Sequence, residues 1–178
     1  MLPVSCERLD ATPSGEQLEA VDQSNAGVVF FLLQGVDLEA MSRPADERLT
    51  EALAPLRTKL DMIIEMLGRL SYRDTELPPL SEIELSVNRI AWFSPRPWQR
   101  GDWLRIRLYF HPTFREPVVL LGKVTSCADD TRGDGCRVEL GLVEMSESTG
   151  ENIARLALLT QRRQRGQRPV PTVERRSE

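Results

Sequence analysis

Hydrophobic residues recur with a heptad period in the first half of the chain. The apolar positions are spaced alternately by four and three residues, and they are Leu49, Leu53, Leu56, Leu60, Ile63, Leu67 and Leu70. This spacing aligns one apolar face along an α-helix, and a repeat of 3.5 residues is typical of helices that supercoil around each other. The pattern therefore predicts a helix over 44–76 whose apolar seam mediates oligomerisation.

The residue types in the seam indicate how many helices associate. Leucine occupies the a positions, Ile63 occupies a d position, and the flanking positions include the apolar residues Ile64 and Met66. These choices favour more than two helices. We therefore expect a homo-oligomer and favour a tetramer; the alternative is an amphipathic helix that packs on its own domain. Pro55 predicts that the helix either begins near this residue or kinks there.

Short segments with alternating apolar and polar residues fill 77–146. In the clearest of them, 102–110, one face would carry Leu104, Ile106, Leu108 and Phe110, and the other Arg105, Arg107 and Tyr109. Further strands are expected at 83–86, 89–94, 117–127 and 136–145. Five short strands separated by turn residues are typical of a small antiparallel barrel.

Two further helical segments are predicted on either side of these elements. A helix over 147–165 should follow the strands, because Ser148 and Glu151 have the spacing of a capping box and apolar residues then recur every three or four positions. Ser14 and Gln17 have a similar spacing and predict a short helix over 14–21. The apolar stretch that follows it is compatible with either a helix or a buried strand, because so short a run shows no decisive period.

Together these elements predict an α+β protein with four parts. They are a helical or irregular segment over 1–43, the heptad helix over 44–76, a barrel with its C-terminal helix over 77–165, and a basic tail over 166–178. Residues 162–178 carry a net charge of +4 and residues 1–161 carry −8, within a total of −4. The tail has too few apolar residues to form a core, so we expect it to be disordered.

The composition argues against an enzyme. The sequence has no nucleophile elbow, no P-loop, no H-E-x-x-H zinc motif and no dinucleotide-binding fingerprint. Its single histidine, His111, belongs to no cluster with metal-ligand spacing. We therefore predict no catalytic residues, no metal ligands and no cofactor.

The same residues bear on the cellular compartment. The three cysteines are odd in number and lack C-x-x-C spacing, so we expect reduced thiols. No signal peptide is recognisable at the N-terminus, and the most apolar run, 28–33, is too short to span a membrane. We therefore expect a cytoplasmic protein without a membrane span.

The order of motifs over 80–165 resembles the PilZ domain family. It consists of a serine in a short bend after the first strand, Gly-Asp opening an alternating strand, a Gly-Lys-Val strand, a final strand that contains glycine, and a C-terminal helix. The resemblance implies a β-barrel that serves in cyclic di-GMP signalling. In this family the ligand is held by R-x-x-x-R ahead of the barrel and by [D/N]-x-S-x-x-G in its first strands.

Both ligand motifs can be placed on this sequence, although the second is degenerate. Arg69 and Arg73 supply R-x-x-x-R, while the second motif falls on Glu84, Ser86 and Arg89, of which only Ser86 matches. Arg89 replaces a glycine where the backbone must approach the ligand, and its Cβ obstructs that approach. The chain is therefore similar to the atypical, tetrameric PilZ subgroup, in which long helices assemble four barrels without the standard ligand residues.

Three functional hypotheses follow, in order of preference. The first is a non-enzymatic adaptor in bacterial cyclic di-GMP signalling that forms a homotetramer, contacts an unidentified signalling protein and lacks standard cyclic di-GMP binding. The second is a direct cyclic di-GMP receptor that uses Arg69, Arg73 and Ser86. The third is a nucleic-acid-binding barrel that uses the basic tail and exposed aromatic residues; the net charge of −4 places it last.

Overall fold

The barrel consists of a single antiparallel sheet. The structure, a computed structural model, describes residues 1–40, 51, 53–56, 58–60, 62–63, 66–67, 76–111, 114–129 and 135–166. Within this part seven strands pair in the order β2-β1-β5-β6-β7-β4-β3. They are β1 (Leu2–Leu9), β2 (Leu80–Ser81), β3 (Ile83–Leu85), β4 (Arg89–Ser94), β5 (Trp103–Leu108), β6 (Val118–Asp129) and β7 (Cys136–Leu142).

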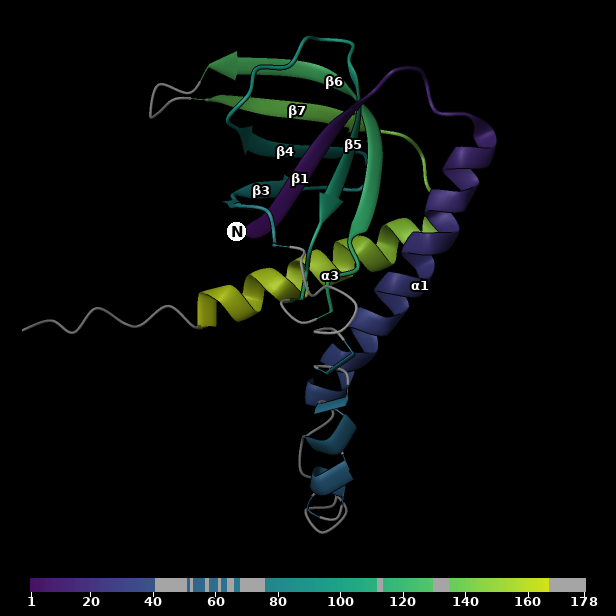
Figure 1. Cartoon of the computed structure of the whole chain (residues 1–178), viewed down its shortest axis with the longest axis vertical. Helices are drawn as coiled ribbons and strands as arrows, with labels where there is room; N and C mark the ends of the chain where they lie inside the picture. Colours follow the sequence, from purple (N-terminus) through teal and green to yellow (C-terminus); the bar gives the residue numbers. More distant parts are fainter. Residues whose placement is uncertain are drawn as a thin grey trace, which may run out of the picture.

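The chain itself brings the two edges of this sheet together. β2 and β3 lie at opposite edges but follow each other in sequence, because β2 pairs with β1 while β3 pairs with β4. The Ser81 hydroxyl of β2 donates a hydrogen bond of 3.0 Å to the carbonyl of Phe93 in β4. The sheet therefore curls into a nearly closed barrel, which confirms the predicted α+β fold class (Figure 1).

The predicted alternation decides which side chains fill the barrel. Leu104, Ile106 and Leu108 of β5 are 0% exposed, whereas the side chains of Arg105 and Arg107 between them remain 31% exposed on the outside. β3 to β7 cover the five segments in which we expected strands, with ends shifted by a few residues. Such shifts are usual where pairing ends.

One strand is not expected from the sequence. The sequence pattern assigns 1–43 to a helical or irregular segment outside the barrel, but Leu2–Leu9 forms β1 and pairs with β5 from Val4↔Leu108 to Leu9↔Trp103. Leu2 and Val4 point into the core. The alternation is hard to recognise because it ends at Arg8, which forms an ion pair at the end of the barrel.

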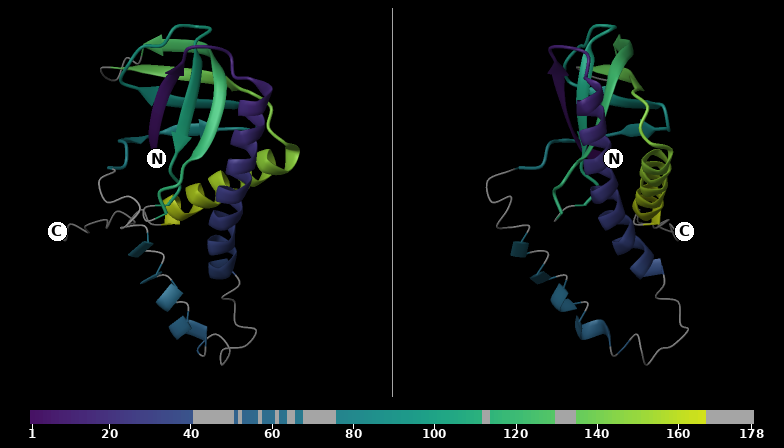
Figure 2. Two further views of the ribbon diagram at one scale, coloured as in Figure 1. Left: turned by 45° about the vertical axis from the view of Figure 1, so that its right-hand side comes forward. Right: turned by 90° about the vertical axis from the view of Figure 1, so that its right-hand side faces the viewer.

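Two helices pack against the barrel, one below the strands and one along its side (Figures 1 and 2). Figures 1 and 2 show α3 (Glu147–Gly166) crossing below the strands and α1 (Gly15–Ala40) descending beside it. Val29 and Leu32 of α1 and Leu156 of α3 belong to the same buried cluster as the inner side of the barrel. The apolar stretch after residue 25, whose sequence is compatible with a helix or a strand, is thus part of a helix.

A serine precedes the first residue of both helices. The expected capping box at the start of α1 is formed, because the Ser14 N–H donates to Gln17 Oε1 at 3.0 Å and the Gln17 N–H donates to Ser14 Oγ at 3.3 Å. The cap of α3 lies two residues earlier than predicted. Ser146, not Ser148, precedes the helix and hydrogen-bonds to the Thr149 hydroxyl at 2.8 Å.

A buried amide fixes α1 to the barrel. Asn25 is 0% exposed, its Nδ2 donates to the carbonyl of Val119 at 2.7 Å, and its Oδ1 accepts from the Val119 N–H at 2.8 Å. The pairing of β6 with β7 begins only at Gly122↔Leu142. The Asn25 side chain therefore takes the place of a neighbouring strand along the part of β6 that β7 does not cover.

The described residues between 51 and 67 are helical, including Pro55. Five seam residues are between 50% and 57% exposed, namely Leu53, Leu56, Leu60, Ile63 and Leu67. The other predicted seam residues, Leu49 and Leu70, lie outside the described residues, as does the predicted basic tail from residue 167 onward. None of the described helices is long and apolar enough to cross a membrane.

Candidate functional site

Ser86 of the degenerate ligand motif stabilises the turn between β3 and β4. Its backbone N–H donates to the carbonyl of Arg89 at 2.8 Å, and its hydroxyl donates to the same carbonyl at 3.1 Å. The residue is exposed to solvent. Its hydroxyl thus already has an acceptor within the turn, so its first role is structural.

The two residues that depart from the motif form ion pairs across the sheet. Glu84 pairs with Arg137 of β7 at 2.5 Å, and Arg89 pairs with Glu139 at 3.6 Å. The hydrogen bond that Arg137 donates to the Glu84 carboxylate raises the pKa of Arg137 above its ordinary value. Acidic and basic charges balance here, so this surface offers no excess of cations to a phosphodiester.

The structure brings part of the predicted site together. Glu84, Ser86 and Arg89 lie within one hairpin formed by β3 and β4. Arg69 and Arg73, which supply the other ligand motif, lie outside the described residues. The hairpin by itself therefore presents a compact turn flanked by ion pairs.

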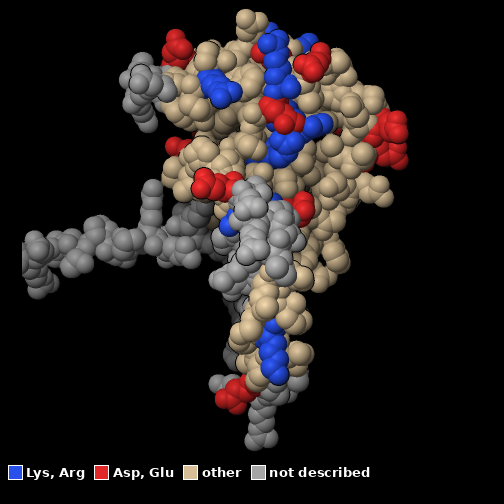
Figure 3. All heavy atoms as spheres, in the orientation of Figure 1, with Lys and Arg blue, Asp and Glu red and all other residues tan. Residues whose placement is uncertain are grey.

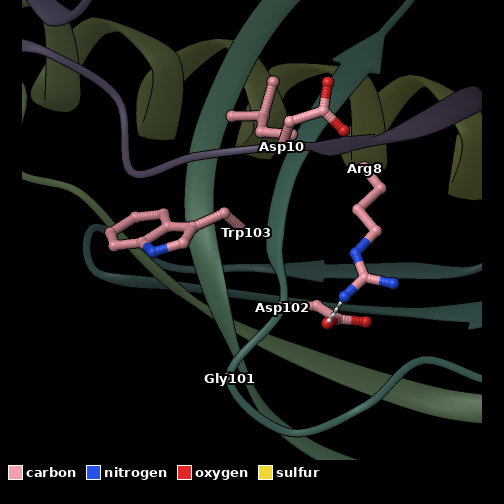
Figure 4. A pocket seen from close by; sticks show the side chains of 6 residues that line it. Arg8, Asp10, Gly101, Asp102 and Trp103 are labelled. Carbon is pink, nitrogen blue, oxygen red and sulfur yellow. Dashed lines mark ion pairs between the residues drawn. The ribbon is translucent and has the colours of Figure 1, made fainter.

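A second site, which the sequence does not predict, lies at the end of β1. A pocket of about 340 Å³ is lined by Arg8, Leu9, Asp10, Gly101, Asp102 and Trp103. Figure 4 shows the Arg8 side chain reaching down to Asp102, with the Trp103 ring on the opposite side. The pocket combines three charged residues with one aromatic side chain.

The Asp102 side chain is buried in this pocket and is held by two polar contacts. It is only 8% exposed, pairs with Arg8 Nη2 at 2.8 Å and accepts a hydrogen bond from the Gln99 N–H at 3.1 Å. Gly101 beside it has a φ of 98°, a conformation that favours glycine. The Gly-Asp pair is visible in the sequence, but its partner Arg8 lies in the strand that the sequence does not predict.

Charged residues continue from the pocket along the outside of β1, β5 and β6. Glu7 accepts from Arg105 Nη1 at 2.7 Å and from Arg107 Nη1 and Nη2 at 2.9 and 3.0 Å. The hydrogen bonds from Arg107 and Arg105 hold the pKa of Glu7 below its ordinary value. The Lys123 ammonium lies 5.9 Å from the centre of the Trp103 ring, within the range of a cation–π contact.

The described residues contain no group of three or more His, Cys, Asp or Glu side chains that could hold a metal ion. Cys6, Cys127 and Cys136 are free thiols. Burial raises the pKa of Cys6 to about 12 and that of Cys136 to about 11, so these two thiols are poor nucleophiles at neutral pH.

Comparison with known proteins agrees with the predicted fold. The structure is similar to the crystal structure of a pathogenic protein from Xanthomonas campestris, described as a new tetrameric PilZ domain self-assembled via an unusual helical bundle. The TM-score is 0.71, the sequence identity is 21%, and the match covers 93% of this chain and 87% of the other. No protein-family model and no curated protein matches the sequence. At this identity the comparison establishes a PilZ-like fold.

Proposed function

We propose that this chain is a non-enzymatic adaptor in bacterial cyclic di-GMP signalling that assembles as a tetramer through the seam of its heptad helix. The PilZ-like barrel supports the signalling role, and the self-assembly described for the similar Xanthomonas protein supports the quaternary structure. Assembly would present four copies of each barrel surface in one particle.

The observation that carries this proposal is the exposure of the seam. Five aliphatic side chains at heptad spacing are about half exposed, and Met62 and Met66 beside them are 59% and 58% exposed. Complete burial of one such side chain stabilises by about 1.5–3 kcal/mol. A continuous stripe of this kind is unfavourable in water but becomes stabilising once several copies associate. Leucine at a, with Ile63 at d, favours four helices over two.

Sedimentation equilibrium at micromolar concentration tests the assembly. We expect the mass of a tetramer for the natural protein and of a monomer for Leu60→Asp, because a carboxylate in the seam would be buried without a partner. Thr58→Asp is the matched control, because position 58 lies on the opposite side of the helix and should keep the tetramer. A natural protein that sediments as a monomer, or a Leu60→Asp variant of unchanged mass, would refute the assembly.

We further propose that the chain does not bind cyclic di-GMP in the standard way. The ion pairs of Glu84 and Arg89, together with the Arg89 side chain in place of glycine, support this. Titration calorimetry with cyclic di-GMP should show no saturable heat. The second candidate, a direct receptor that uses Arg69, Arg73 and Ser86, is favoured by the exposed position of Ser86. Sub-micromolar binding that is lost in Arg73→Ala would establish this candidate in place of the adaptor.

A further inference from the structure

A group of cations lies on the outer surface of β5 and β6, next to the pocket. We call it the basic strip, and it consists of Arg105, Arg107 and Lys123 together with Glu7 of β1, which holds the two arginines. Three cations and one acid give it a net charge of +2, which stands out on residues 1–161 with their total of −8. Figure 3 shows basic side chains gathered with a few acidic ones over β1 and β5.

The sheet register makes the strip continuous. Leu9, Trp103 and Lys123 form one row across β1, β5 and β6, and Glu7 and Arg105 lie in the next row on the same face. Arg107 lies one row further along β5. The cations therefore follow the direction of β5 for about three rows, at roughly 7 Å per row. An extended peptide has the same repeat of about 7 Å between side chains that face one way.

Glu7 holds the guanidinium groups of the strip in place without covering them. A guanidinium has five N–H donors. Arg105 donates to Glu7 through Nη1 alone, and the side chains of Arg105 and Arg107 both remain 31% exposed. Groups that are already fixed lose little entropy when they bind a further anion, so the strip is prepared for carboxylates.

The pocket at the end of the strip supplies an apolar contact. Leu9 and Trp103 are half-buried and line a volume of about 340 Å³, which is enough for an apolar side chain. Two of the charged residues that line this pocket, Arg8 and Asp102, pair with each other, and Asp10 is the third. A ligand with both carboxylates and an apolar anchor matches the strip and the pocket together.

We propose that the basic strip and its pocket dock an extended acidic segment of a partner protein. Carboxylates at alternate positions face Arg105, Arg107 and Lys123, and one apolar side chain enters the pocket beside Trp103. This deepens the proposed adaptor function and rests on it, because it specifies the surface that an adaptor presents. A long nucleic acid fits less well, because the strip has only three cations, Glu7 offsets one of them, and the acidic body repels a polyanion.

The probe is a fluorescein-labelled peptide in which three Glu residues alternate with Gly and one Leu stands at the end of this repeat, and binding is followed by fluorescence anisotropy. We expect saturable binding to the full chain that weakens as salt increases, and no saturation with the same peptide carrying Lys in place of Glu. Lys123→Glu should reduce the affinity by about tenfold or more. Arg155→Glu, a charge reversal at an exposed position of α3, should change the affinity by less than about twofold.

Several outcomes would overturn the docking proposal. They are no binding of the Glu peptide, equal binding of the Lys peptide, equal losses in Lys123→Glu and Arg155→Glu, or tighter binding of a duplex DNA of similar length. If Lys123→Glu fails to fold, as judged by circular dichroism, Arg107→Gln replaces it with the same expected direction. The sedimentation experiment separates this proposal from the assembly: a tetramer that does not bind the peptide refutes docking alone, and a monomer that binds it refutes assembly alone.

Discussion

The barrel and the heptad helix use apolar residues in opposite ways. In the barrel, every second residue of β5 is apolar and 0% exposed, and within the described residues no buried side-chain nitrogen or oxygen lacks a hydrogen-bond partner. In the helix, five apolar residues at heptad spacing remain at least 50% exposed. The barrel with α1 and α3 therefore forms a core within one chain, whereas the helix keeps an exposed apolar face of the kind that the proposed assembly would bury.

Truncation of a core residue tests this contrast with the largest expected effect. Ile106→Ala should lower the free energy of unfolding by about 2–5 kcal/mol, because it leaves a cavity among fully buried neighbours. Urea denaturation followed by tryptophan fluorescence measures this directly, since Trp92, Trp98 and Trp103 all belong to the barrel or its loops.

Leu60→Ala is the matched truncation in the seam. Leu60 is 51% exposed, so its loss should leave the tryptophan transition of the dissociated chain nearly unchanged while weakening association in sedimentation. The contrast between the two regions fails if Leu60→Ala destabilises the dissociated barrel as much as Ile106→Ala does.

Removal of the hydrogen bonds between α1 and the barrel should have the next largest effect on the free energy of unfolding. Asn25→Ala removes both hydrogen bonds to Val119 and leaves a backbone N–H and C=O buried without these partners. We expect a loss of about 1–3 kcal/mol in the free energy of unfolding. Gln23→Ala, on the same helix, should change stability by less than about 0.5 kcal/mol, because Gln23 is exposed. Urea denaturation of both variants checks this; equal effects would show that Asn25 does not fix α1 to β6.

The sequence predicts the elements whose pattern is local and periodic. The strict alternation of 102–110 identifies β5 and its inward face, and the Ser14–Gln17 spacing identifies the start of α1. It does not predict β1, because Cys6, Glu7 and Arg8 blur the alternation, and the role of Glu7 depends on partners about 100 residues away. Nor does the sequence define the length of α1, because its apolar residues fit a strand equally well. The contact between Asn25 and Val119, which joins α1 to β6, is visible only in the structure.

The candidate sites also divide into those that a local sequence pattern predicts and those that depend on strand pairing. The seam and the degenerate motif are visible as local strings of residues, and the hairpin of Glu84, Ser86 and Arg89 lies where the strand pattern places it. The pocket and the basic strip are not visible, because they depend on the register of β1 against β5. Nor could the sequence reveal that Glu84 and Arg89 form ion pairs with β7, since this depends on the pairing of β4 with β7.

Gly122 lies where β6 packs closely against β7, whereas Gly27 lies on an open part of α1. A Cβ at Gly122 would collide with the carbonyl of Gly141 and lie 2.9 Å from the Leu140 side chain, so Gly122→Ala should cost about 1–3 kcal/mol of unfolding free energy. A Cβ at Gly27 of α1 would meet nothing within 4 Å beyond its own helix, so Gly27→Ala should stabilise the protein by about 0.5–1 kcal/mol. Thermal denaturation should thus shift in opposite directions, and shifts of the same sign would contradict the close approach of β6 and β7.

The smallest expected effect concerns the ion pairs outside the barrel. Arg107 and Arg105 lower the pKa of Glu7 in the folded protein, so the stability that they contribute is present above the ordinary glutamate pKa and is lost as the pH falls below it. Because the Glu7 side chain is 41% exposed, solvent screens the pair and Glu7→Gln should cost less than about 1 kcal/mol at neutral pH. Urea midpoints of the natural and variant proteins should therefore differ slightly at pH ~7 and converge below pH ~4. A difference that stays constant across this range would mean that Glu7 acts through packing rather than charge, and that the outer strip contributes to stability in the same way as the core.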